Sequence, residues 1–166
     1  MRRRRSATRK HRARAVKVVG DSRALVLRIG LAILAVPSLV VGIWAAFAPR
    51  GFYDDFPGLG RMWVAPDGPY NEHLVRDVGE LNLALALVTV VALVALTPML
   101  VRAVLAGWIV YSVPHLVYHL RHLDPFEADD QISIIASLAL VPALAIVLLV
   151  IEVRAGDKST RVAAVD

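Results

Sequence analysis

The chain has no cysteine among its 166 residues. Disulfides, thiolate nucleophiles, iron–sulfur clusters and thiol-ligated zinc are therefore excluded. It also has no glycine-rich phosphate loop and no internal repeat. Its first and last long apolar stretches contain no histidine, which argues against paired haem ligation, and neither Ser112 nor Ser133 has partners spaced for a serine hydrolase. These absences leave few classes of chemistry open.

What the chain has in excess is apolar residues, at 57% with a mean hydropathy of +0.60, too high for an ordinary soluble domain. A spanning helix needs about 20 mostly apolar residues. Four stretches come close to that length or meet it, at residues 24–48, 78–96, 99–120 and 132–151. The sequence therefore predicts an all-α fold, a four-helix transmembrane bundle. A four-pass domain over 21–152 lies between a basic, disordered tail at 1–20 and a second tail at 153–166.

A cleaved signal peptide is the alternative reading of the first stretch. Arginines precede it, and Ala46-Phe47-Ala48 resembles a cleavage site. However, the apolar run is about 25 residues long, whereas the apolar region of a signal peptide has about 7–15. Pro49 would also follow the cut. A retained helix is the favoured interpretation.

The charges predict the orientation. Of 19 Lys and Arg residues, 15 fall in residues 1–28, in the short link at Arg102 and in the tail after 152. Ten acidic residues fall in the two longer loops or at the helix ends beside them. Positive charge marks the cytoplasmic side. We therefore expect a multi-pass protein of the cell membrane with both termini in the cytoplasm.

The basic N-terminal segment has two readings. Its charge suits orientation and attraction to anionic lipid, at about 1 kcal/mol per base near the surface. Nucleic-acid binding is the alternative interpretation, but no aromatic residue is interleaved with the Lys and Arg residues and a spanning stretch follows directly. Anionic lipid is the expected partner, and nucleic acid is not.

The segments between the spans carry structural signals. Residues 49–70 combine Pro and Gly with five aromatic residues, which predicts an ordered outer cap rather than a flexible linker. Asn71 can cap the second spanning helix, and Asp129 or Asp130 the fourth. Thr97-Pro98 forms a tight turn, so we expect the second and third helices to be antiparallel neighbours along their length.

One polar constellation could carry chemistry, and it consists of two sets spaced i, i+4, i+7. The sets are His73, Asp77 and Glu80, and His115, His119 and His122. Each set forms one helix face. Counting about 1.5 Å per residue from the Thr97-Pro98 turn places the two sets at similar heights. His115 and His119 are expected to face the bundle interior, near Glu80.

Three interpretations of this constellation stay open. It is a structural network of ion pairs and hydrogen bonds, which Arg76 and Arg121 could join. Alternatively, the six residues His73, Asp77, Glu80, His115, His119 and His122 hold a divalent metal such as zinc, iron or manganese. Thirdly, they form a proton or substrate relay. The histidine spacing also resembles the boxes of membrane desaturases and hydroxylases, but a second box is missing.

A family resemblance rests on residues 68–87, GPYNEHLVRDVGELNLALAL, with support from VPHLVYHLRHLDP at 113–125. The first passage resembles the entry to the second helix in small actinobacterial membrane proteins of the DoxX-like class. Arg76, Gly79 and the Leu and Ala run at 81–87 carry the likeness. The resemblance implies a four-helix membrane bundle and supplies no agreed activity. The His-rich third span departs from this pattern, which puts the class's suggested redox association in doubt.

The sequence thus favours a structural or partner-binding membrane component. Its expected partners are the bilayer and either a second copy or another membrane protein. A metal-dependent membrane oxidoreductase, or a metal or proton transporter using the same constellation, is the alternative, so enzymatic activity is left open.

Overall fold

Four long helices make up most of the computed structural model, which describes the backbone of residues 2–163 and the side chains of 22–155. They are α1 (Arg2–Phe47), α3 (Glu72–Ala95), α4 (Pro98–Leu120) and α5 (Ala128–Ala163). Each contains a stretch long and apolar enough to cross a membrane, at Ser22–Phe47, Glu72–Ala95, Pro98–Leu120 and Ala128–Ala155. The predicted all-α, four-helix membrane architecture is confirmed.

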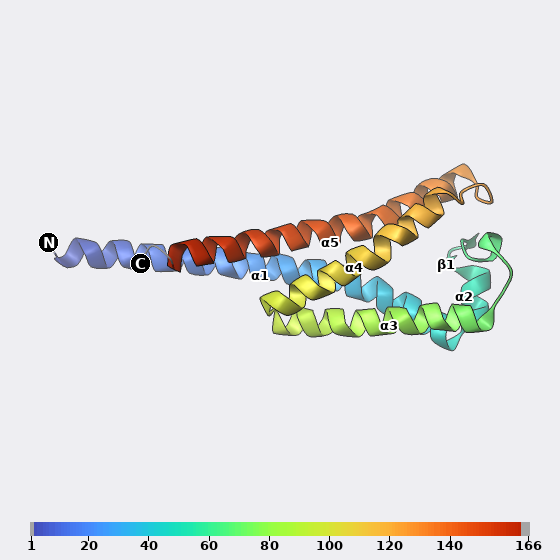
Figure 1. Ribbon diagram of the computed structural model, residues 1–166, viewed down its shortest axis with the longest axis horizontal. Helices are drawn as coiled ribbons and strands as arrows, with labels where there is room; N and C mark the ends of the chain where they lie inside the picture. Colours follow the sequence, from blue (N-terminus) through green and yellow to red (C-terminus); the bar gives the residue numbers. More distant parts are fainter. Residues whose placement is uncertain (1, 164–166) are drawn as a thin grey trace.

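The beginning of α1 and the end of α5 lie at one end of the molecule, called here the termini end (Figure 1). The opposite end is called the cap end. α1 has helical backbone from Arg2 and α5 continues to Ala163. Residues 2–19 contain no Gly or Pro and are rich in Arg and Ala, which favour helix, so α1 extends beyond its apolar part. The division into a tail over 1–20, a four-pass domain over 21–152 and a tail over 153–166 stays a prediction.

The cap consists of α2 (Pro49–Asp55), the two-residue strands β1 (Pro57–Gly58) and β2 (Arg61–Met62), and the 3₁₀ helix η1 (Ala65–Asp67). The strands pair antiparallel around a turn in which Gly58 and Gly60 adopt φ of 97° and 77°. Phe52 is buried against Trp44 and Phe56. The predicted ordered cap is confirmed, because these rings anchor it to the end of α1.

The spanning helices are arranged as two pairs, in which α3 packs mainly on α1 and α4 mainly on α5. α3 and α4 meet at the Thr97-Pro98 turn and diverge toward the cap end (Figure 1). Antiparallel neighbours were predicted along the whole length, and that is correct only near the turn. The α1–α3 contact explains the difference. An ideal Cβ on Gly79 would lie 2.4 Å from the backbone nitrogen of Ala46, so glycine allows a close approach that draws α3 onto α1.

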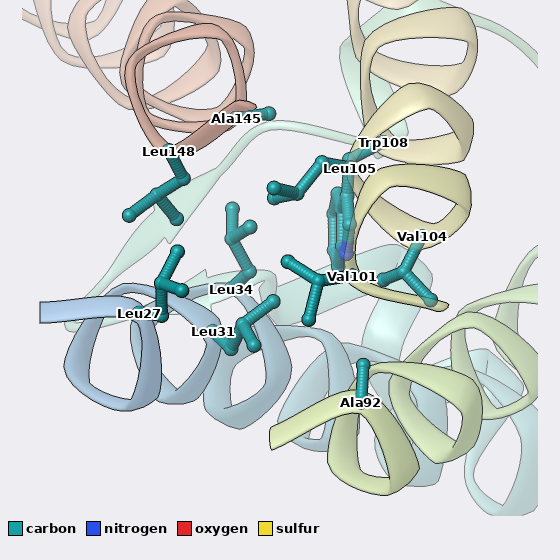
Figure 2. Close-up of a cluster of buried hydrophobic side chains, with 10 residues drawn as sticks. All are labelled: Leu27, Leu31, Leu34, Ala92, Val101, Val104, Leu105, Trp108, Ala145 and Leu148. Atoms are coloured by element: carbon teal, nitrogen blue, oxygen red, sulfur yellow. The ribbon is translucent and has the colours of Figure 1, made fainter. Parts of the chain in front are cut away.

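The main core lies toward the termini end, where side chains from all four spanning helices converge (Figure 2). Leu31 of α1, Leu105 of α4 and Leu148 of α5 are almost completely buried there. At one edge of this core, the indole Nε1 of Trp108 donates a hydrogen bond of 2.9 Å to Thr89 Oγ1. The two helix pairs are therefore joined in this half of the molecule.

An ion pair that the sequence analysis did not anticipate ties the same end together. Glu152 of α5 is only 1% exposed and pairs with Arg23 of α1. Its second carboxylate oxygen lies 3.8 Å from Nε of Arg102 on α4. Membrane-embedded ionisable groups generally face the bundle interior and pair with one another. The sequence signal that could have identified it was an acid directly at the end of an apolar run.

Candidate functional site

The structure separates the two polar sets that the sequence placed together. His115 and His119 are part-buried and line a cavity between the helix pairs, so the expectation that they face the interior is confirmed. Glu80 is exposed and is not part of that lining. Counting from the turn assumed that α3 and α4 stay in contact, and their divergence makes that assumption wrong.

The α3 set occupies a different face of its helix. The side chains of His73 and Asp77 are 87% and 46% exposed, and His73 Nε2 lies 3.4 Å from Asp77 Oδ2. On the same helix it is Val78 and Asn82 that line the cavity. His73, Asp77 and Glu80 therefore face away from it.

His122 also lies outside the cavity lining. It is exposed beyond the end of α4, with its ring stacked on Tyr118 at a centroid distance of 4.1 Å. Its Nδ1 lies 2.7 Å from the Tyr118 carbonyl oxygen. This local contact explains its position without a ligand.

The predicted metal site is not formed. Among the side chains that the structure describes, no group of three or more His, Asp or Glu residues is placed to hold a metal ion. The six residues of the predicted set contribute two imidazoles to the cavity, and the other four lie elsewhere. A catalytic zinc site needs three protein ligands, so two imidazoles do not form one. The predicted iron and manganese sites would use the same six residues, of which four lie outside the cavity.

The cavity has a volume of about 470 Å³ and lies between the α1–α3 and α4–α5 pairs, beneath the cap. Every spanning helix contributes to its lining, with apolar residues such as Leu34, Val78, Ile134 and Val141. Leu74, Val78 and Tyr111 remain exposed, so the cavity is not sealed where α3 and α4 diverge. It is an apolar chamber open between two spanning helices.

Polar groups are few in this lining, and most are already paired. Ser38 Oγ lies 3.0 Å from both the backbone and the side-chain carbonyl oxygen of Asn82, to either of which it can donate. Asn82 Nδ2 in turn donates to the Val78 carbonyl at 2.9 Å and approaches the Tyr111 hydroxyl at 3.4 Å. Ser112 Oγ donates to the Trp108 carbonyl at 2.6 Å. Because these polar groups already bind one another or the backbone, the part of the wall that they form is effectively apolar.

The cap end of the cavity is more polar. The His115 ring stacks on Tyr111, with centroids 5.7 Å apart, and meets the His119 ring edge-on at 4.8 Å. Asp67 of the cap also lines the cavity. His119 Nδ1 is buried and has no hydrogen-bond partner among the described residues. A carboxylate and two imidazoles thus belong to the same cavity lining.

The cap is fastened to α5 beside the cavity. Arg61 pairs with Asp130, and its Nη2 lies 3.1 Å from Asp129 Oδ2. The indole Nε1 of Trp63, another lining residue, donates to Asp130 Oδ1 at 2.7 Å. The sequence predicted Asp129 or Asp130 as the N-cap of the fourth helix, but α5 begins at Ala128. Both acids lie in its first turn and bind the cap instead.

Comparison with protein-family models, with curated proteins and with solved structures finds no match to this chain. The resemblance to the DoxX-like class therefore stays a prediction, and function must be argued from the geometry.

Sequence reasoning missed Asp67, Asn82's bond to Ser38 and the cavity itself. Asp67 follows Pro66 in a loop rich in Pro and Gly, where an isolated carboxylate gives no periodic signal. Asn82 and Ser38 are single polar residues inside apolar runs, and that was the available signal for them. The cavity has no local signature, because five separate segments build it.

Proposed function

We propose that this protein is a multi-pass membrane protein that binds a lipophilic small molecule in the cavity beneath its cap. The observation that carries the proposal is the cavity of about 470 Å³, lined by apolar side chains from all four spanning helices. Ligand sites typically occupy about 300–1,000 Å³ and combine apolar walls with a few convergent polar groups. His115, His119 and Asp67 are such groups here.

The contrast within the bundle supports a site rather than loose packing. Protein interiors are close-packed, with few voids larger than a water molecule. The termini half follows this rule, with Leu31, Val101 and Leu105 showing no exposed surface. The cap half holds its helices apart, while the Arg61–Asp130 pair keeps the cap in place. The opening between α3 and α4 suits a molecule that enters from the bilayer.

A matched pair of variants tests the proposal. Ser137 and its neighbour Ala136 are both exposed, but only Ser137 lines the cavity. Ser137→Phe places a ring in the cavity, and Ala136→Phe places the same ring outside it. We expect purified wild-type protein and Ala136→Phe to bind N-phenyl-1-naphthylamine, a neutral lipophilic probe, saturably at one molecule per chain in calorimetric titrations. Ser137→Phe should weaken binding at least tenfold. Equal binding by both variants, or none by the wild type, would refute the proposal.

A partner-binding role is the second candidate, because the exposed face of α3 carries Glu80. A helix needs about 20 residues to cross the hydrocarbon. Counted back from Leu96, these reach residue 77, which places Glu80 inside that region. A carboxylate facing lipid is costly there, and another protein would relieve the cost. The expected partner is a second copy or another membrane protein.

Cysteine cross-linking tests this face, since the chain has no native cysteine. If a second copy covers it, Glu80→Cys should form disulfide-linked dimers in membranes, and Leu81→Cys on the adjacent exposed face should not. Equal cross-linking at both positions would argue against a specific interface.

The orientation with both termini in the cytoplasm is proposed with this function. It is supported by the 15-to-4 distribution of basic residues and by the beginning of α1 and the end of α5 lying toward the same end of the molecule (Figure 1). The cap and the polar end of the cavity then face outward. Anionic lipid at the basic N-terminal segment follows from the same charge.

A further inference from the structure

The lining of the cavity has an unbalanced charge. Among the described residues that line it, Asp67 is the only acid, and none is Lys or Arg. The arginines of the cap region are engaged elsewhere. Arg50 pairs with Asp54 at 2.7 Å, Arg61 with the start of α5, and Arg76 with Glu72 at 2.9 Å. Among the described residues, no Lys or Arg lines the cavity beside this carboxylate.

The Asp67 backbone is held firmly in position. Its N–H donates to the Val64 carbonyl at 3.1 Å, closing the turn of η1. The hydroxyl of Tyr53 donates to the Gly68 carbonyl at 2.7 Å and lies 3.3 Å from the Ala65 carbonyl oxygen. Tyr53 thereby fastens both sides of the turn to α2. These bonds fix the backbone from which the Asp67 side chain extends at the edge of the cavity.

Aromatic rings surround the same space. Phe52, Phe56 and Trp63 line it from the cap, and Trp108 and Tyr111 from α4. Phe56 and Trp63 meet edge-to-face, with centroids 6.1 Å apart. The faces of aromatic rings attract cations, and this attraction strengthens when water is excluded. A carboxylate beside several rings in an apolar chamber is a recognition site for a cation that carries apolar groups.

We propose that the ligand of this cavity is a lipophilic cation, with Asp67 as its counter-ion and the aromatic residues as its walls. This inference rests on the proposed binding function. The proposal requires that neither His115 nor His119 competes with the ligand for Asp67 as an imidazolium. In the competing arrangement a protonated imidazole neutralises Asp67 and the ligand is uncharged.

Two probes of nearly identical size and shape separate these arrangements. Tetraphenylphosphonium is a cation and tetraphenylborate is an anion with the same four rings. Each is titrated against N-phenyl-1-naphthylamine already bound to the purified full-length protein. We expect tetraphenylphosphonium to displace it from the wild type at a concentration at least tenfold lower than tetraphenylborate, after correction for the partition of each ion into detergent.

Substitutions at Asp67 test whether its carboxylate causes the preference for the cation over the anion. Asp67→Asn should weaken displacement by the cation by at least tenfold more than it weakens binding of the neutral probe. Asp67→Glu should keep the preference. Asp55→Asn, which removes an exposed carboxylate of the cap outside the cavity, should behave as the wild type. A circular dichroism spectrum equal to that of the wild type shows that each variant is folded.

The outcomes distinguish the inference from the function on which it rests. If the neutral probe binds and Ser137→Phe removes it, but the two ions compete equally or Asp67→Asn has no effect, the ligand class is wrong and the binding function stands. Stronger displacement by tetraphenylborate than by tetraphenylphosphonium would likewise show that the ligand is not a cation. If the neutral probe does not bind the wild type, the binding function itself fails.

Discussion

The contact between α1 and α3 gives the sharpest test of the fold, through Gly79→Ala. An ideal Cβ at position 79 would lie 2.4 Å from the Ala46 nitrogen and 2.9 Å from the Ala45 carbonyl carbon. Ordinary contacts of a Cβ begin at 3.4 Å, so the backbones would have to separate by about 1 Å (3.4 − 2.4). Both atoms belong to the backbone, so no side-chain rotation relieves the clash.

The magnitude follows from two opposing effects. Overpacking costs about 1–3 kcal/mol, and Ala recovers about 1 kcal/mol of helix propensity relative to Gly. We therefore expect Gly79→Ala to lower the free energy of unfolding by about 1 kcal/mol. Gly107 of α4 supplies the control, because nothing lies within 4 Å of its ideal Cβ. Gly107→Ala should be neutral or stabilising by up to about 1 kcal/mol.

The measurement is reversible unfolding of the two variants in mixed micelles of a mild detergent and dodecyl sulfate, followed by circular dichroism. The quantity to compare is the difference between the variants, expected at about 1–2 kcal/mol. Because α3 carries Asn82 into the cavity wall, Gly79→Ala should also weaken binding of the neutral probe. Equal stability of the two variants would refute the close approach and, with it, the explanation for the divergence of α3 and α4.

Three further predictions concern other contacts. Arg23→Met should destabilise the protein by about 3 kcal/mol, because it leaves the buried Glu152 facing only Arg102 at 3.8 Å. Glu152→Gln should cost less, since both arginines can then reach the membrane surface. If unfolding titrations show that Glu152→Gln is the more destabilising variant, this reasoning is wrong. Trp108→Phe should lower the free energy of unfolding by about 1 kcal/mol through loss of the hydrogen bond to Thr89. A double-mutant cycle with Thr89→Val should show coupling between the two residues, and a coupling energy of zero would mean that the bond is absent in the membrane. For topology, Leu59→Cys, on a fully exposed cap residue, should react with an impermeant maleimide added to intact cells, and Ser6→Cys should react only after lysis; the opposite pattern would reverse the orientation.

The sequence by itself determined the elements and their connections. Apolar length alone located the four spans, with the largest difference at the second, predicted from 78 and observed from Glu72, since a bilayer of fixed thickness demands a minimum apolar length. The side chain of Asn71 accepts a hydrogen bond from the Leu74 N–H, as its place before α3 predicted. Pro98 begins α4 after Thr97, as a proline at the first helical position should. These features depend on neighbours in the chain, so a sequence reveals them.

Only the tertiary structure decided which helices pair and therefore which polar residues meet. The Thr97-Pro98 turn makes α3 and α4 start together, but it does not hold their far ends. The absence of side chains at Gly42 and Gly79 lets α3 approach α1 closely, and that contact turns the face bearing Glu80 away from His115 and His119. Those imidazoles instead share the lining of the cavity with Asp67 of the cap. Spacing along a helix fixes which residues share a face, whereas packing against other helices fixes what that face contacts.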